Sequence, residues 1–310
     1  MLAVGACAWQ LPVRAEGTVC QATILSSYPN GTWLENIAQD ARGRLYISVT
    51  SERKIVLYQS GTGTRLFANL PIYPMGFAIL KDRLVVAGNR HPMSEGAPAM
   101  LTGNAIAEVS LAGKVLKVTE LSEARMLNGV TATPDGAILV ADSRGATIWR
   151  YDPHSGAATR WLKNEQLAAP TGAPAMSVGV NGLKFLGRQL FMSNTARGEI
   201  LTVPVTRTGA PAGPISALHH TGIVDDFDIA SDGTIIAAPY KNNVIRVSPK
   251  GAIDIVLSAG AEGATAISLI GPRAKPTGFY VLTTGNLLFG GKLPAKLLLV
   301  PLPGPAGCPR

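Results

Sequence analysis

One internal repeat constrains the fold of this chain more than any other feature. Each unit holds an apolar segment, a tight turn with Asp or Gly, a second segment of alternating apolar residues, and then a third and a more variable fourth segment. Apolar alternation with a period of two predicts β-strands, and Asp-Gly pairs predict tight turns between them. Six units recur at about 40–50 residues, the spacing of propeller blades. The units begin near Asn36, Met75, Asn128, Asn181, Asp226 and Thr265.

This pattern predicts an all-β fold, a six-bladed β-propeller. Units two and four, over 75–89 and 181–194, are looser than the others, and unit six, over 265–286, has a longer first turn. Only 160–170 has the composition of a helical turn. The chain has 310 residues, of which 46% are hydrophobic, and it contains no Gly/Ser linker. We therefore expect one propeller domain over 16–310.

The ends of the chain are expected to close the ring together. An open propeller would leave unpaired strand edges. Unit six ends in a third strand over 296–302, and a segment over 19–26 has no other place, so antiparallel pairing of the two supplies the missing fourth strand. This pairing brings Cys20 beside Cys308 and predicts a disulfide between them, across a loop that spans nearly the whole chain.

The first residues have the pattern of an export signal. Leu2 to Leu11 form an apolar run, and the small residue Ala15 follows Pro12 by three positions. We expect residues 1–15 to be a signal peptide with a start of translation upstream of Met1, because the usual basic segment is missing. An ordinary apolar N-terminus is the alternative. The predicted disulfide favours the same conclusion, an exported protein in the periplasm or outside the cell. No segment predicts a transmembrane helix.

The charge of the chain argues against a nucleic-acid partner. The formal net charge is +8 and the isoelectric point is near 9.5, but Lys and Arg are scattered singly. Nucleic-acid binding would gather them on one face or one helix. A solvated basic surface is therefore expected. A small-molecule substrate and a monomer are expected as well.

Four polar residues occupy one position of their units. Glu35, Asn128 and Asp225 lie eight residues before the turn glycines, and Asn181 lies six residues before a shorter turn. In a propeller this is the start of the innermost strand, so the four side chains converge at one mouth of the central channel. Their oxygens suit a divalent cation, Ca²⁺ first and then Mg²⁺, Mn²⁺ or Zn²⁺. The two Asn-Gly pairs also fit ordinary turn residues, which stays open.

The same position in units two and six holds Met75 and Thr265, so the mouth is expected to be polar on one side and apolar on the other. Trp33 is a candidate apolar wall, and His91 lies in a loop of the kind that can overhang the mouth. Together with Asn128, these four residues are the candidate substrate-binding residues. No G-x-S-x-G motif supports a hydrolase triad.

Four motifs resemble the SMP-30/gluconolactonase/LRE-like propellers, over about 33–284. They are LENIAQDARGRLYIS, LNGVTATPDGAILVADS, VNGLKFLGRQLFMSN and VDDFDIASDGTIIAA. The resemblance implies a metal held by Glu35, Asn181 and Asp225 with Asn128 beside it. It also implies hydrolysis of a lactone or ester, because the metal polarises the carbonyl and lowers the pKa of a bound water. Asp225 or Asp226 is then the expected general base.

Two motifs depart from this family. Glu35-Asn36-Ile37 stands where typical members have Glu-Gly-Pro, and Asp225-Asp226-Phe227 stands where they have Asp-Gly. These variants resemble a divergent branch that includes hetero-Diels-Alderase-like propellers, which guide a cyclisation without hydrolysis. A metal-dependent lactonase or esterase is expected first. A pocket that binds or cyclises a small natural product without metal, and a non-enzymatic binding or scaffold propeller, are the alternatives.

Overall fold

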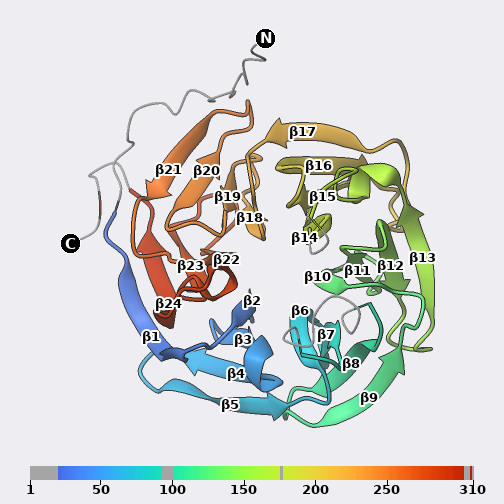
Figure 1. Ribbon diagram of the computed structural model, residues 1–310, viewed down its shortest axis with the longest axis horizontal. Coiled ribbons are helices and arrows are strands. Elements are labelled where there is room, and N and C mark those ends of the chain that lie inside the picture. The colour runs from blue at the N-terminus through green and yellow to red at the C-terminus, as the bar shows by residue number, and fades with distance from the viewer. Residues whose placement is uncertain (1–19, 93–100, 175–176, 304–307, 309–310) are drawn as a thin grey trace, which may run out of the picture.

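The computed structural model describes residues 20–92, 101–174, 177–303 and 308. These residues form six four-stranded antiparallel sheets, which lie around a common axis as the blades of a propeller (Figure 1). Their helical content is limited to the short 3-10 turns η1 (Thr50–Glu52), η3 (Glu165–Leu167) and η4 (Leu287–Phe289). The predicted all-β six-bladed propeller is thus confirmed. The described part of the chain contains no helix that is long and apolar enough to cross a membrane.

In blades 1 to 5 the strands follow one another outward from the axis, so that neighbours in sequence pair in space. Blade 1 contains β2 (Leu34–Gln39), β3 (Leu45–Val49), β4 (Lys54–Gln59) and β5 (Gly63–Asn69). Blade 2 contains β6 (Tyr73–Ile79), β7 (Arg83–Asn89), β8 (Asn104–Ser110) and β9 (Val115–Glu120). Blade 3 contains β10 (Leu127–Ala132), β11 (Ile138–Asp142), β12 (Thr147–Tyr151) and β13 (Ala158–Lys163). Blade 4 contains β14 (Val180–Leu186), β15 (Gln189–Asn194), β16 (Glu199–Pro204) and β17 (Ser216–His220). Blade 5 contains β18 (Phe227–Ile229), β19 (Ile235–Ala237), β20 (Val244–Val247) and β21 (Ile253–Leu257).

Blade 6 joins the two ends of the chain. It contains β22 (Ala264–Ile270), β23 (Gly278–Thr283), β24 (Pro294–Pro301) and, on its outer edge, β1 (Thr23–Asn30). The predicted ring closure is confirmed, because β1 pairs antiparallel with β24 and places Thr23 opposite Leu299. The closing strand begins at Thr23, four residues after the start of the predicted segment 19–26, because the residues before it lead to the disulfide. Cys20 and Cys308 are bonded as predicted, with Cα atoms 5.4 Å apart.

The core lies between the blades rather than at the axis. Alternate residues of a middle strand face the two neighbouring blades. In β7, for example, Val85 packs in the apolar cluster with blade 3 and Val86 in the cluster with blade 1. Both side chains are fully buried. This two-sided burial explains why the second segment of several units is apolar almost throughout, since neither face of the strand meets water.

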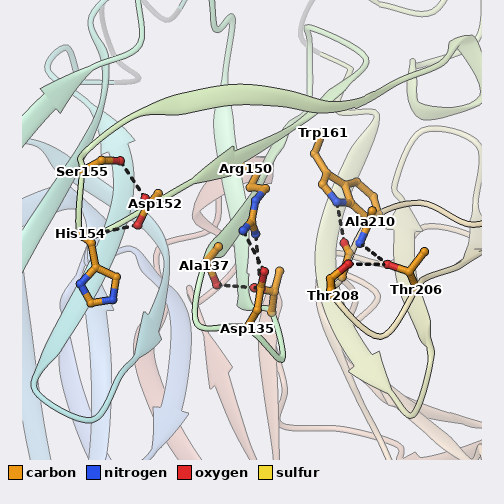
Figure 2. Close-up of polar contacts among 12 residues, drawn as sticks. Asp135, Ala137, Arg150, Asp152, His154, Ser155, Trp161, Thr206, Thr208 and Ala210 are labelled. Atoms are coloured by element: carbon orange, nitrogen blue, oxygen red, sulfur yellow. Dashed lines mark hydrogen bonds and ion pairs between the residues drawn. The ribbon is translucent and has the colours of Figure 1, made fainter.

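Polar side chains hold the turns and tie neighbouring blades together (Figure 2). Asp135 forms an ion pair with Arg150 of β12 at 2.9 Å, across the turn that precedes β11. After β12, Asp152 accepts hydrogen bonds from the backbone N–H of His154 and from the Ser155 hydroxyl. The indole N–H of Trp161 on β13 donates to the Gly209 carbonyl oxygen at 2.8 Å, which ties the outer edge of blade 3 to blade 4.

Removal of the disulfide is expected to weaken the ring closure. The bond joins residues 288 positions apart, so its loss frees the denatured chain of a long constraint. We expect the double variant Cys20→Ser/Cys308→Ser to lose about 2–5 kcal/mol of unfolding free energy. Denaturant titration followed by tryptophan fluorescence measures this change. Dithiothreitol should lower the wild-type midpoint to that of the variant and leave the variant unchanged. Equal midpoints for the oxidised wild type and the variant would contradict a closing role.

Candidate functional site

The strand next to the axis is irregular at the predicted site position. In the five blades that start with β2, β6, β10, β14 and β22, this strand has a register shift against its neighbour near its first residues. Such bulges turn a side chain away from the regular alternation. Glu35, Asn128 and Asn181 lie within these irregular segments, and Asp225 lies two residues before β18. The four residues that share a repeat position therefore share a structural position.

The glycines that follow Asn128 and Asn181 are required by close packing. A Cβ atom on Gly129 would lie 2.1 Å from the Asn181 carbonyl oxygen, and one on Gly182 would lie 2.4 Å from Asp226 Oδ1. Neither glycine has a positive φ. The alternative that the Asn-Gly pairs are turn residues is wrong, because both pairs lie inside strands where one blade approaches the next.

Hydroxyl groups fix the position of Asp225 from the neighbouring blade. Ser193 Oγ of β15 donates to the Asp225 carbonyl oxygen at 2.7 Å and accepts the Gly182 N–H at 2.8 Å. Thr195 Oγ1 donates to the Val224 carbonyl oxygen at 2.8 Å. All these hydroxyls are buried. Two hydrogen bonds from blade 4 thus hold the backbone that carries Asp225.

A cavity of about 560 Å³ lies at this end of the ring, and we call it the mouth cavity. Its polar lining residues are Glu35, Asn128, Ser177, Thr195 and Tyr240. Its other lining residues are Trp33, Met75, Met126, Ala173, Pro174, Val178, Ala196, Ile223, Leu288 and Phe289. The cavity is therefore an apolar chamber with a few polar groups, the general form of a small-molecule site.

The structure brings only some of the candidate substrate residues together. Trp33, Met75 and Asn128 line the mouth cavity, whereas Thr265 and His91 are absent from its lining. Thr265 is fully buried, and its hydroxyl donates to the Leu34 carbonyl oxygen at 2.7 Å, which joins blade 6 to blade 1. The backbone N–H of His91 donates to the Asn89 side chain in the loop after β7.

Asn181 and Asp225 lie behind the cavity wall. Asn181 Nδ2 donates to Asp225 Oδ1 at 2.5 Å and to Thr195 Oγ1 at 3.1 Å. Asp225 Oδ2 is buried without a partner of normal hydrogen-bond geometry, although the Tyr240 hydroxyl is near enough to lower the pKa of this carboxyl. The lining residues Thr195 and Tyr240 thus connect the cavity to this buried pair.

Burial dominates the charge state of the two predicted metal-binding carboxyls. It raises the pKa of Glu35 from 4.5 to about 7, with a further rise from the charge of Asp226, while the hydrogen bond from Trp33 Nε1 opposes the rise. Burial also raises the pKa of Asp225 well above its ordinary value, and the charge of Glu35 adds to the effect. Both groups are therefore poorly compensated as anions.

Asp226 has a different environment from Asp225. Lys184 Nζ of β14 lies 2.7 Å from its Oδ1 and 2.9 Å from its Oδ2. Burial raises the pKa of Asp226, but the Lys184 ammonium opposes this rise. Asp226 is also absent from the cavity lining. Both oxygens are occupied by an ammonium group, so the geometry favours Asp225 over Asp226 as the freer base.

Tyr240 is a site residue that the sequence reasoning missed. It follows β19 with φ of +56°, in the left-handed region, where a bulky residue carries about 1–2 kcal/mol of strain. Its ring lines the mouth cavity, and burial raises the pKa of its hydroxyl well above the ordinary range, with a further rise from Asp225. Tyr240 lies in the turn after the second strand of its blade. This turn is outside the repeated slot, the position that Glu35, Asn128, Asn181 and Asp225 share in their units, so alignment of the repeats gave no signal for it.

The predicted ligand set fits a divalent cation in charge and donor type. In the part of the chain that the structure describes, no three His, Cys, Asp or Glu side chains are close enough to hold a metal ion. The set would therefore need amide oxygens from Asn128 and Asn181 beside Glu35 and Asp225. The unpartnered Asp225 Oδ2 is the observation that fits, because a buried carboxylate oxygen without a partner is costly and is a hard ligand.

No protein-family model matches the chain. Two curated fungal proteins are similar in sequence, and both are assigned as hetero-Diels-Alderases. The protein from Sarocladium schorii is 23% identical over 317 residues, which cover 87% of this chain and 78% of the relative. The protein from a Phoma species is 23% identical over 326 residues, which cover 91% and 90%.

Several solved structures with the same fold belong to the family that the motifs resemble. A gluconolactonase of Xanthomonas campestris has a TM-score of 0.65 at 18% identity, covering 91% of this chain and 90% of its own. A luciferin-regenerating enzyme has 0.65 at 14%, covering 94% and 97%. Regucalcin of Agrobacterium tumefaciens, described as a calcium-binding protein, has 0.64 at 16%, covering 93% and 97%. These neighbours confirm the resemblance at the level of fold, with the low identity of a divergent relative.

Replacement of Glu35 by Gln is expected to stabilise the protein above neutral pH. Because burial raises the pKa of Glu35 to about 7, the wild type loses stability as the pH rises through the interval between the unfolded and the folded pKa. A neutral Gln avoids this loss and still accepts the Trp33 hydrogen bond. We expect the variant to exceed the wild type by about 2–3 kcal/mol at pH 8 and to match it near pH 4, in denaturant titrations.

Glu123→Gln is the matched control, since Glu123 is exposed and pairs with Arg160 at the surface. Its effect should be small at both pH values. If Glu35→Gln changes stability equally at pH 4 and pH 8, the raised pKa of Glu35 is wrong.

Proposed function

We propose that this propeller is an enzyme that binds a largely apolar small molecule in the mouth cavity and promotes its cyclisation. One observation carries the proposal. The walls of the cavity are apolar over most of their area, and two polar residues, Glu35 and Asn128, are presented from the innermost strands β2 and β10. The hetero-Diels-Alderase assignment of the two fungal relatives supports the same chemistry.

The apolar walls favour an apolar substrate. A sugar lactone presents hydroxyl groups in every direction, and each would lose its hydrogen bonds to water against Trp33, Met75 or Met126. An apolar skeleton with one conjugated carbonyl group instead matches walls of this kind, with Glu35 and Asn128 as the polar groups among them. The exposed rim residues Ile223 and Phe289 extend the apolar surface outward, with 47% and 69% of their areas accessible.

A hetero-cycloaddition makes modest demands on the protein. Two σ bonds form, one of them to oxygen, three π bonds become one, and no atom or proton leaves. The cavity supplies the folded conformation in which the two reacting parts meet, which lowers the entropic part of the barrier. The Asn128 amide, and the Glu35 carboxyl when protonated, are hydrogen-bond donors for the developing negative charge on the carbonyl oxygen.

Metal-dependent hydrolysis of an apolar lactone or ester is the second candidate. The unpartnered Asp225 Oδ2 and the poorly compensated charge of Glu35 favour it. A divalent cation there would polarise the scissile carbonyl and lower the pKa of a water molecule. Glu35, Asn181 and Asp225 would hold the cation, and the Asn128 amide would orient the substrate at the cavity wall.

Export is proposed as well. The Cys20–Cys308 disulfide is of the kind that forms and persists in oxidising compartments. The predicted signal peptide over 1–15 lies outside the described residues, and it stays a prediction, as does the monomeric state.

Binding of a neutral apolar dye tests the cavity itself. We expect N-phenyl-1-naphthylamine to bind with enhanced fluorescence and one site per chain. Ile223→Asn at the rim should weaken binding about tenfold, because an apolar contact worth about 1–2 kcal/mol is lost. Leu116→Asn on the outer strand β9 is the matched control, since Leu116 is equally exposed at 50%. Equal loss of binding in both variants, or no binding by the wild type, would contradict an apolar substrate site.

Chelation separates the two candidate reactions. A panel of conjugated carbonyl compounds with a tethered alkene reports cyclisation, and a panel of aryl esters and lactones reports hydrolysis. We expect cyclisation to persist in EDTA. Hydrolysis that is lost in EDTA, restored by Ca²⁺ or Zn²⁺, and reduced by at least about 100-fold in Asp225→Asn would establish the second candidate instead. Turnover of neither panel by protein that binds the dye would leave only a binding function.

A further inference from the structure

We propose that Tyr240 is a catalytic residue, and that its hydroxyl donates a hydrogen bond to the reacting carbonyl oxygen of the substrate. This inference rests on the proposed function of the mouth cavity. It goes beyond that function, because the repeated slot supplies Glu35 and Asn128 whereas Tyr240 comes from a turn outside the repeat.

The position of Tyr240 joins the apolar and the polar parts of the site. Its ring lines the cavity with Phe289, and the two ring centroids lie 6.5 Å apart in an edge-to-face arrangement. Its hydroxyl faces the buried pair of Asn181 and Asp225. A substrate that fills the apolar chamber therefore meets the phenol where the polar groups begin.

The backbone at Tyr240 indicates that this position is held for a purpose. A φ of +56° is rare for a bulky aromatic residue, and such strain persists only where the surroundings determine it. The Tyr240 N–H donates to the Ala264 carbonyl oxygen of β22 at 3.2 Å, which ties the turn to blade 6. Glycine would relieve the strain but would remove both the ring and the hydroxyl from the cavity.

Two buried polar groups lie near the Tyr240 hydroxyl and support its donation of a hydrogen bond to the substrate. The Asn181 amide and the Asp225 carboxyl lie near enough to the phenol to shift its pKa, the carboxyl raising it and the amide lowering it. Both groups are fixed before the substrate arrives, because the Asn181 amide donates to Asp225 and to Thr195, so little reorganisation is needed when charge develops on the carbonyl oxygen. The reaction needs no net proton transfer, because the phenol keeps its proton while it donates the hydrogen bond.

A carbonyl dye tests this role without knowledge of the natural substrate. The probe is 4-dimethylaminochalcone, whose absorption shifts to the red when its carbonyl oxygen accepts a hydrogen bond. Wild-type protein should bind the probe with a red-shifted spectrum. Tyr240→Phe keeps the ring, so it should bind the probe only about two- to tenfold more weakly, and the red shift should disappear.

Two comparisons make the result decisive. Tyr280→Phe is the matched control, since Tyr280 lies on β23 and is absent from the cavity lining. It should keep both affinity and red shift. The carbonyl-free analogue 4-dimethylaminostilbene should bind the wild type and Tyr240→Phe equally well. Circular dichroism and thermal melting confirm that each variant is folded.

The outcomes separate this inference from the function on which it rests. If the wild type binds neither probe, the apolar site is wrong and the role of Tyr240 falls with it. If the wild type binds both probes but shows no red shift, or if Tyr240→Phe keeps the shift, only the role of Tyr240 is overturned. Loss of stilbene binding in Tyr240→Phe would also overturn it, because the hydroxyl would then maintain the shape of the cavity instead of contacting the carbonyl oxygen.

Discussion

The site depends on how closely the innermost strands approach one another around the axis. At Gly76, Gly129 and Gly182 the backbone or side chain of the next blade occupies the space where a Cβ atom would be, at 2.4, 2.1 and 2.4 Å. Only glycine permits this contact. Each glycine follows the slot residue directly, and the bulge that allows the approach also turns the slot side chain out of the regular pleat. Ring packing and the convergence of the polar side chains therefore have the same local cause.

Ring closure imposes the second constraint, and it acts through the chain ends. The outer strand of blade 6 is β1, from the N-terminal part of the chain, which pairs with β24. The Cys20–Cys308 bond lies just beyond this pair of strands. At the axis the same junction is held by the Thr265 hydroxyl on the Leu34 carbonyl oxygen. Leu34 directly precedes Glu35. The closure of the ring thus sets the position of Glu35, the carboxyl that lines the mouth cavity among the described residues.

Features that repeat were predictable from the sequence, and features that occur once were not. The strands, the closing pair and the slot of Glu35, Asn128, Asn181 and Asp225 all follow from a register marked by turn glycines. Tyr240 and the Lys184–Asp226 pair have no counterpart in other units, so alignment of the repeats left them without a signal. A further repeat in the sequence marks the contact between blades, since the hydroxyls of Ser48-x-Thr50 and of Ser193-x-Thr195 both donate to carbonyl oxygens at the start of the next blade.

Asp226 stands where the motif of the resembled family has glycine, and this difference changes the chemistry at the centre of the propeller. An Asp in this place brings a buried carboxyl against Gly182, and Lys184 two residues further along β14 neutralises it. A buried charge that lacked such a partner would be strongly destabilising. The pair therefore adds no net charge, and the acid that remains at the cavity wall is Glu35, whose pKa of about 7 keeps it largely neutral in mildly acidic solution. A neutral acid and a phenol beside apolar walls suit hydrogen-bond donation to a carbonyl better than they suit the binding of a sugar.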